Sequence, residues 1–250
     1  MRTLKLTMAY DGTDFAGWQS QPRGRTVQDV LEAALTKITG ETRRVVASGR
    51  TDAGVHALGQ VVSFCTECAL SAELFLRALN SELPRDAVIL ASEEAPADFH
   101  AIRSARRKRY RYQIQDGPLP DVFSRRYAWR IFPSLDEDAM RTAAAALLGE
   151  HDFASFQSSG AKRASTIRTV SEISIRRSRA GEGGPELLQL EVEADGFLYH
   201  MVRNIVGTLA LVGRGKRPAE WLTEVLRALD RRAGGPTAPA QGLFLVKVEY

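Results

Sequence analysis

The stretch Leu4–Tyr10 (LKLTMAY) decides the fold, because large apolar side chains occupy every second position along it. This period of two is typical of a strand with one buried face. Downstream, apolar residues recur at helical spacing between Thr26, a predicted N-cap, and Gly40, a predicted helix stop. The rest of this half predicts strands at 42–48, 60–64 and 87–90 and a helix at 71–81.

The resulting β-α-β-β-α-β order resembles a ferredoxin-like split βαβ unit, and the second half repeats the plan. There, we predict strands at 108–115, 167–177, 187–194 and 243–248 and helices at 136–148, capped by Ser134, 198–212 and 218–229. The expected fold class is α+β, with two ferredoxin-like-derived halves, 1–104 and 105–250. They are expected to form a mixed, mostly antiparallel sheet with helices on one face and a basic cleft between the halves.

Composition excludes several classes of protein. The chain has 250 residues, of which 44% are hydrophobic and 26% charged, as in ordinary globular proteins. No run of 18 apolar residues encodes a membrane span, and the N-terminus lacks the apolar region of a signal peptide. With only two cysteines, in a CxxC arrangement, we expect a cytoplasmic protein with no membrane partner.

The positive charge is concentrated in one window of the chain. Residues 101–130 carry 9 basic and 2 acidic groups, whereas residues 1–100 carry 10 and 13 and residues 131–250 carry 15 of each. Six of the nine residues from Arg103 to Arg111 are basic, and Tyr110 lies among them. The run fits a solvated edge strand whose charge prevents unwanted pairing. It also fits a phosphate-binding track, which the interleaved tyrosine favours.

The densest polar cluster runs from Ser48 to His56 (SGRTDAGVH) between two predicted strands. A cation beside Asp52 would favour its carboxylate form, and an ionised aspartate can act as nucleophile or general base. A tight turn stabilised by an Arg50–Asp52 pair explains the same residues, and composition alone does not choose. A zinc site at Cys65 and Cys68 lacks a second ligand pair. Asp11 and Asp14 are expected to shape their glycine-rich loop or line the path of a polyanionic partner rather than bind a metal.

Seven segments in order resemble the tRNA pseudouridine synthase A family, and they span nearly the whole chain. One is Gly49–His56 with the following Gly59-Gln60-Val61-Val62, and another is Tyr10–Gln19 (YDGTDFAGWQ). The others are Arg25–Gln28, Phe99–Ala101 with the basic run ending in Tyr110-Arg111-Tyr112, His151–Phe153, Gly196–Asn204 and Ala238–Leu243. The sequence departs from the family pattern at Ile102-Arg103, where the family has Arg directly after Phe-His-Ala.

The resemblance implies an isomerase that needs no cofactor and no metal. Its substrate would be uridine at positions 38, 39 and 40 in the anticodon stem-loop of tRNA, whose N-glycosidic bond is broken and re-formed through C5. Asp52 would be the catalytic nucleophile, although addition to C6, attack on C1′ and removal of a ribose proton all remain open. By the same resemblance, Arg203 would pair with Asp52, Arg50 would support it, and Tyr110 would stack on the uracil.

The predicted partner is tRNA, bound by a homodimer, as the resemblance implies. The residues expected to contact the tRNA are Arg106, Arg107, Lys108, Arg109, Arg111, Asp14 and Trp18. Two other classes of function stay open at this point: a tRNA-binding protein without catalysis, and a metal-dependent RNA phosphoesterase.

Overall fold

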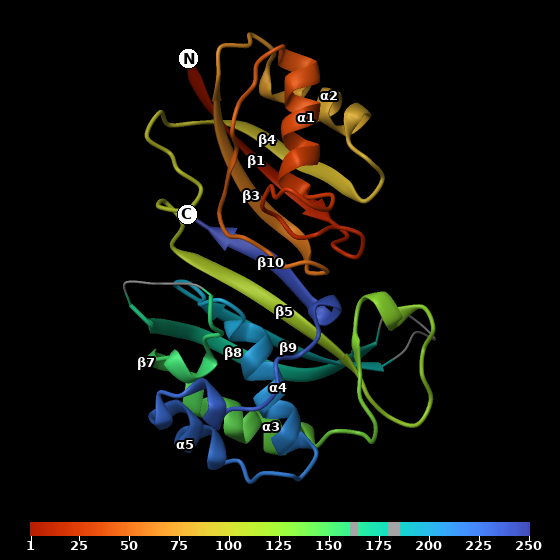
Figure 1. Cartoon of the computed structure of the whole chain (residues 1–250), viewed down its shortest axis with the longest axis vertical. Helices are drawn as coiled ribbons and strands as arrows, with labels where there is room; N and C mark the ends of the chain where they lie inside the picture. Colours follow the sequence, from red (N-terminus) through yellow and green to blue (C-terminus); the bar gives the residue numbers. More distant parts are fainter. Residues whose placement is uncertain (161–164, 180–185) are drawn as a thin grey trace. The chain divides into compact units, whose positions relative to one another are not determined.

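The chain folds into two compact units in a computed structural model that describes residues 1–160, 165–179 and 186–250 (Figure 1). The first unit comprises Met1–Arg106 and Phe244–Tyr250, and the second comprises Arg107–Leu243. Both combine helices with mostly antiparallel strands. The predicted α+β class is therefore confirmed.

The first unit is a sheet built around β1 (Arg2–Tyr10), which pairs antiparallel with both β3 (His56–Thr66) and β4 (Ala87–Ala95). The short β2 (Val46–Ala47) pairs antiparallel with the other edge of β3. The last strand, β10 (Leu243–Glu249), pairs in parallel with the start of β3, where Phe244 lies opposite His56. Two helices, α1 (Val27–Thr39) and α2 (Ala72–Glu82), pack against each other in this unit.

The predicted patterns explain these elements. Leu4, Leu6, Met8 and Tyr10 of β1 are all buried, as their alternation requires. Helix α1 begins where predicted, because the Thr26 hydroxyl accepts a hydrogen bond from the Asp29 N–H at 3.2 Å. It ends at Gly40, whose φ of 72° is the left-handed conformation typical of a helix stop.

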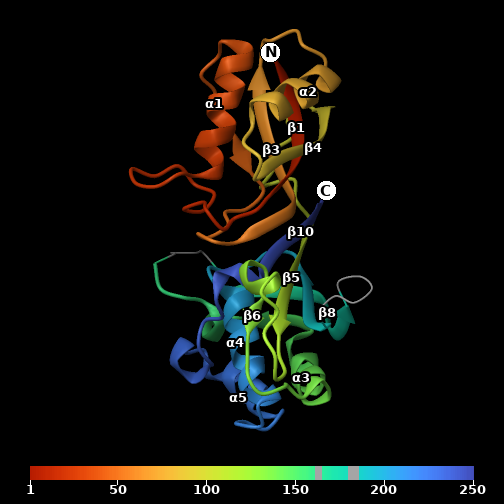
Figure 2. The same ribbon diagram turned by 90° about the vertical axis from the view of Figure 1, so that its right-hand side faces the viewer.

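The second unit is a sheet in the order β5-β9-β8-β7, all antiparallel (Figure 1), with the short β6 parallel to β5 (Figure 2). Its helix α3 packs against the other two helices and against β8. The most apolar helix, α4, is buried along most of its length. The strands are β5 (Arg107–Gln115), β6 (Trp129–Arg130), β7 (Gly149–Asp152), β8 (Ile167–Arg179) and β9 (Glu186–Ala194), and the helices are α3 (Glu137–Ala144), α4 (Met201–Gly213) and α5 (Trp221–Ala228).

Three local predictions are wrong in detail. The strand predicted at 42–48 is reduced to Val46–Ala47. The cap of α3 is Asp136 rather than Ser134, because the Asp136 carboxylate accepts a hydrogen bond from the Ala139 N–H at 2.9 Å. The same helix stops at Ala144 and continues only as one 3₁₀ turn. Among the described residues, no helix is long and apolar enough to cross a membrane.

Candidate active site

The loop that carries Asp52 connects β2 to β3 and is held by hydrogen bonds to side chains of two strands, β1 and β3. The hydroxyls of Thr51 and Tyr10 of β1 lie 2.8 Å apart. Gln60 of β3 donates its side-chain N–H to the carbonyl of Gly49 at 2.7 Å and accepts a hydrogen bond from the Ser48 hydroxyl at 2.6 Å. Buried polar groups of this kind stabilise a loop only in the geometry that satisfies them. The sheet therefore determines the path of this loop.

A second loop, Asp11–Gln19, packs directly on the first. The Trp18 N–H donates to the carbonyl of Thr51 at 3.0 Å, and the Gly12 N–H donates to Nδ1 of His56 at 3.0 Å. Gly12 is required here, because a Cβ at this position would lie 2.0 Å from the carbonyl oxygen of Val55. Two segments predicted separately from the sequence thus meet in the first unit.

Asp52 lies in a turn of this loop and is partly exposed. Its carbonyl accepts a hydrogen bond from the Val55 N–H at 3.1 Å, which fixes the backbone at the carboxylate-bearing residue. Arg50 is exposed and, within the described part of the chain, forms no ion pair. The structure therefore does not support the reading in which an Arg50–Asp52 pair stabilises the turn.

The remaining candidates of the first unit have different environments. Trp18 is only 3% exposed, and its ring centroid lies 6.2 Å from that of Tyr10, so its side chain is part of the core. Asp14 is exposed. Asp11 shapes the loop, as predicted, because its carboxylate accepts hydrogen bonds from the N–H and hydroxyl of Thr13 at 3.0 and 2.6 Å. Contact of Asp14 and Trp18 with tRNA stays a prediction, which binding measurements on their variants would test.

The residues that the structure describes include no cluster of three or more His, Cys, Asp or Glu side chains able to hold a metal ion. Cys65 is exposed and Cys68 partly buried, and neither forms a disulfide. Nδ1 of His56 lies 3.1 Å from the Asp11 carboxylate, and Nδ1 of His100 accepts a hydrogen bond from the Ile102 N–H. These histidines organise the backbone around them.

In the second unit, Tyr110 lies on the helix-covered face of β5. It is 8% exposed and meets the ring of Phe197 edge-on, with centroids 5.0 Å apart. Tyr112 lies on the same face, fully buried, and its hydroxyl donates to the carbonyl of Pro239 at 2.7 Å. Burial raises the pKa of Tyr112, and the positive charge of Arg203 acts against that shift.

Arg203 extends from the first turn of α4 and is held by the segment that precedes β10. Its Nε donates to the carbonyl of Ala238 at 2.8 Å, and its own carbonyl accepts from the Ala238 N–H at 3.1 Å. Three segments noted in the sequence therefore converge in the second unit: β5, the start of α4 and residues 238–242.

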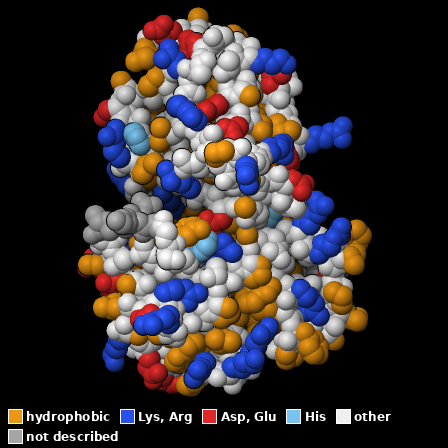
Figure 3. Space-filling model, viewed as in Figure 1, with side chains coloured by type: hydrophobic (Ala, Val, Ile, Leu, Met, Phe, Trp, Pro, Cys, Tyr) orange, Lys and Arg blue, Asp and Glu red, His pale blue; other side chains and the backbone are white. Residues whose placement is uncertain are grey.

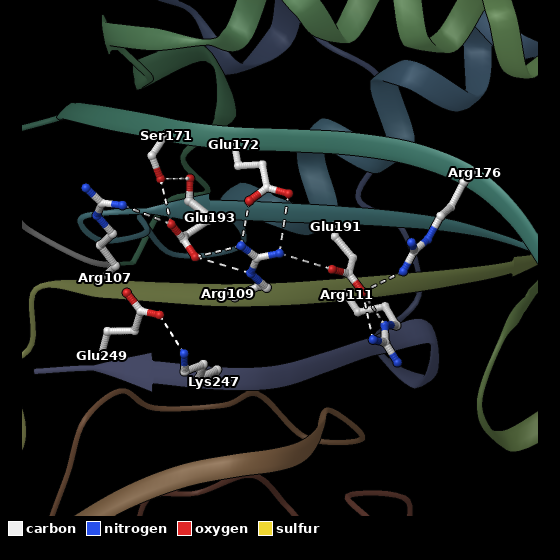
Figure 4. A network of polar contacts seen from close by, with 10 residues as sticks. All are labelled: Arg107, Arg109, Arg111, Ser171, Glu172, Arg176, Glu191, Glu193, Lys247 and Glu249. Atoms are coloured by element: carbon white, nitrogen blue, oxygen red, sulfur yellow. Dashed lines mark hydrogen bonds and ion pairs between the residues drawn. The ribbon is translucent and has the colours of Figure 1, made fainter.

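The three arginines of β5 occupy its opposite face, where they meet carboxylates of β8 and β9 (Figure 4), whereas Lys108 has the same alternation as Tyr110. Arg109 lies 2.9 Å from Glu193 and 2.5 Å from Glu172, and Arg111 lies 2.7 Å from Glu191. Arg107 is 3.5 Å from Glu193 and Arg176 is 3.9 Å from Glu191. Burial acts to raise the pKa of Glu191 and Glu193, but the arginines hold both pKa values below the usual range.

This network shows that part of the positive charge in residues 101–130 is paired with carboxylates of neighbouring strands. Arg107, Arg109 and Arg111 are spaced by two, so a strand places them on one face, where three glutamates balance most of their charge. Arg106, by contrast, is exposed. On the face seen in Figure 3, Lys and Arg side chains are scattered over both units rather than gathered in one patch. Phosphate binding by these residues stays a prediction.

The predicted residues are divided between the units. Asp52, Arg50, Asp14 and Trp18 belong to the first, whereas Tyr110, Arg203 and the arginines of β5 belong to the second. The predicted pairing of Arg203 with Asp52 stays a prediction.

Two buried polar side chains that support these groups lie within the motifs noted in the sequence, but their supporting role was not predicted. Gln60 and Asn204 are 0% exposed, and each makes several hydrogen bonds. An available signal was a polar residue inside an otherwise apolar strand or helix, because such a group is buried only with its partners.

Comparison with known proteins finds one family model and relatives that match along nearly the whole chain. Residues 6–102 and 143–250 match a family model described as tRNA pseudouridine synthase. The chain is 49% identical, over 100% of both sequences, to tRNA pseudouridine synthase A of Moorella thermoacetica. It is 43% identical to the protein of that name from Acetivibrio thermocellus, again over 100% of both, and 47% identical to that of Halalkalibacterium halodurans, over 98% of this chain and 91% of the relative.

Proposed function

This chain belongs to the tRNA pseudouridine synthase family, and on that premise we propose that it is an isomerase that converts uridine to pseudouridine in tRNA at positions 38, 39 and 40 of the anticodon stem-loop. The reaction breaks the bond between N1 of uracil and C1′ of ribose and forms one between C5 and C1′. C5 loses a proton and N1 gains one, so substrate and product contain the same atoms.

Asp52 is the catalytic group in this proposal, and the geometry of its loop is the observation that carries it. The loop is tied to β1 through Tyr10 and to β3 through Gln60, while the carboxylate-bearing residue is partly exposed. A reacting group needs this combination of a fixed backbone and access to substrate. Addition to C6, attack on C1′ and removal of a ribose proton all start from such a carboxylate.

The supporting roles follow the resemblance. Arg203 would hold Asp52 ionised, Arg50 would lie against the substrate, and Tyr110 would stack on the uracil once the nucleotide has left its helix. Extruding a base costs a few kcal/mol, and stacking on an aromatic ring recovers about 1–3 kcal/mol. Because Tyr110 and Arg203 belong to the second unit, this proposal requires both units to act on one uridine. We further propose that the protein acts in the cytoplasm as a homodimer and that its two halves are ferredoxin-like, with a basic cleft between them.

The test is tritium release from tRNA labelled at C5 of uridine, because forming the new bond expels that hydrogen. We expect Asp52→Asn to abolish release while tRNA binding is retained. The matched control, Asp138→Asn, removes a carboxylate that is 88% exposed on α3 and should leave release unchanged.

Other outcomes would identify other functions. Full activity of Asp52→Asn would rule out its catalytic role. Tight tRNA binding by the wild type without any pseudouridine would indicate a binding protein, and EDTA-sensitive cleavage of the RNA would indicate a phosphoesterase. Replacing the uridines at 38, 39 and 40 one at a time should remove the product at that position alone.

A further inference from the structure

A buried amide lies next to Arg203 in the first turn of α4. Asn204 donates its side-chain N–H to the carbonyl of Phe156 at 2.8 Å. Its Oδ1 accepts from the Thr237 hydroxyl at 2.6 Å and from Nη2 of Arg231 at 3.0 Å. A carbonyl on one side and two donors on the other leave only one orientation of the amide satisfied.

Thr237 belongs to a segment that is pressed closely against α4. A Cβ on Gly207 would lie 1.7 Å from the carbonyl oxygen of Pro236, so only glycine allows this approach. The Gly235 N–H donates to the Thr208 hydroxyl at 2.9 Å. The hydrogen bond from the Thr237 hydroxyl to Oδ1 of Asn204 therefore joins this segment to the first turn of α4, directly before Ala238.

The same contacts keep a partly buried cation in place. Burial lowers the pKa of Arg231, and among the described residues no carboxylate pairs with it. Its Nη2 donates to Asn204 and, at 3.2 Å, to the Thr237 hydroxyl. Neutral acceptors therefore solvate this charge, which makes loss of either one costly and keeps both in position.

We propose that Asn204 and Thr237 are positioning residues for Arg203. Thr237 precedes Ala238, whose carbonyl accepts from Nε of Arg203. A displaced Thr237 moves this acceptor and with it the direction of the guanidinium group. The inference rests on the proposed function, in which Arg203 holds the catalytic carboxylate ionised.

The experiment separates positioning from stability by using matched variants of Thr237. Thr237→Val replaces the hydroxyl by a methyl group of similar size. Thr237→Ala removes both the hydroxyl and the methyl group, and Thr237→Ser keeps the hydroxyl without the methyl group. Each is made in the wild-type and in an Arg203→Lys background. The readouts are the single-turnover rate of pseudouridine formation at saturating tRNA, the Kd for tRNA, and the midpoint of thermal unfolding.

We expect Thr237→Val and Thr237→Ala to slow turnover about tenfold in the wild-type background, with Kd unchanged and the rate restored in Thr237→Ser. In the Arg203→Lys background the same changes should cost less than about twofold, because residues that act through one another are not additive.

Two results would overturn the inference. Equal losses in both backgrounds would show that Thr237 acts independently of Arg203, and a slow Thr237→Ser would show that the hydroxyl is not the link. A wild-type protein that forms no pseudouridine would instead overturn the proposed function, and the inference with it.

Discussion

The hydroxyl groups of Tyr10 and Thr51 lie 2.8 Å apart in the interior of the first unit, and they join the end of β1 to the loop of Asp52. Burial raises the pKa of Tyr10 to about 12, although its hydrogen bonds with Thr51 and Gln60 act against the shift. The phenol is therefore protonated over the whole range in which a tRNA-modifying enzyme would be assayed, and the link persists there.

Tyr10→Phe should change the alkaline limb of the stability curve. A folded pKa of about 12, above the ordinary value of 10.0, means that the contribution of this group is complete below pH 10 and lost as pH rises through 12. The free energy of unfolding of the wild type should therefore fall by about 2–3 kcal/mol more than that of the variant. Urea unfolding at pH 8, 10, 11 and 12 measures this, and parallel curves would contradict it.

Gly12→Ala should disorganise the Asp52 loop, because the new Cβ would lie 2.0 Å from the Val55 carbonyl oxygen. We expect at least a tenfold loss of turnover from a displacement of about 1 Å and a lower midpoint of thermal unfolding. The control is Gly196→Ala, whose Cβ would meet only the flexible Arg168 side chain at 3.5 Å. If the midpoint of Gly12→Ala were as unchanged as that of the control, the Asp11–Gln19 loop and the Asp52 loop would be able to move apart without loss of stability.

Asp116 and Arg177 should govern acid stability in the second unit. Their side chains form two hydrogen bonds of 2.8 Å, and Asp116 is 2% exposed. Burial acts to raise the pKa of Asp116, but bonds from Arg177 and the Leu135 N–H hold it below the usual range. The stabilisation is thus complete above about pH 4 and is lost as pH falls through the lower, folded pKa.

Removing this charge at neutral pH is expected to be costly. Asp116→Asn should lower the free energy of unfolding by about 3 kcal/mol, because it breaks the buried pair and leaves Arg177 only its longer ion pairs with Glu137 and Glu186, at 3.6 and 3.8 Å. Asp138→Asn, which breaks only an exposed pair with Arg141, should cost less than about 1 kcal/mol. Equal effects in chemical unfolding at pH 7 would contradict the assigned importance of burial.

The salt dependence of tRNA binding should separate Arg106 from Arg109. Arg106 is exposed, so losing one phosphate contact in Arg106→Ala should reduce the slope of log K against log salt by about 0.7–0.9. Arg109 is already paired with Glu193 and Glu172, so Arg109→Ala should mainly destabilise the fold, because buried Glu193 loses its nearer cation and retains only Arg107, at 3.5 Å. Filter binding from 50 to 300 mM salt checks both, and a reduced slope for Arg109→Ala would assign it to the phosphate track.

Elements defined by local signals were predictable from the sequence. Helix α1 is one, because Thr26 and Gly40 act on the backbone beside them. Helix α3 was misplaced at its start, because Ser134 and Asp136 are both good caps and only the folded chain decides between them. The short β7 has no alternating pattern to reveal it and exists because β8 is its neighbour.

The candidate site was predictable at the level of motifs and not of partners. The tie between the Gly49–His56 and Tyr10–Gln19 segments depends on hydrogen bonds between residues about 40 positions apart. The arginines of β5 look like a phosphate track in the sequence because their carboxylate partners lie more than 60 residues away. Pairings of this kind are set by sheet register, which the charge pattern of one strand does not contain.

The pairing of β10 with β3 has a consequence for how this protein is made. Phe244 stacks on His56 with ring centroids 4.6 Å apart, and the Tyr250 hydroxyl donates to the carbonyl of Ala101 at 2.9 Å. The unit that carries Asp52 is therefore discontinuous in the sequence, because the whole second unit lies between its two parts. A fragment of residues 1–106 would have the entire Asp52 motif without the strand that pairs with the start of β3, so the first unit is completed only after the second has been synthesised.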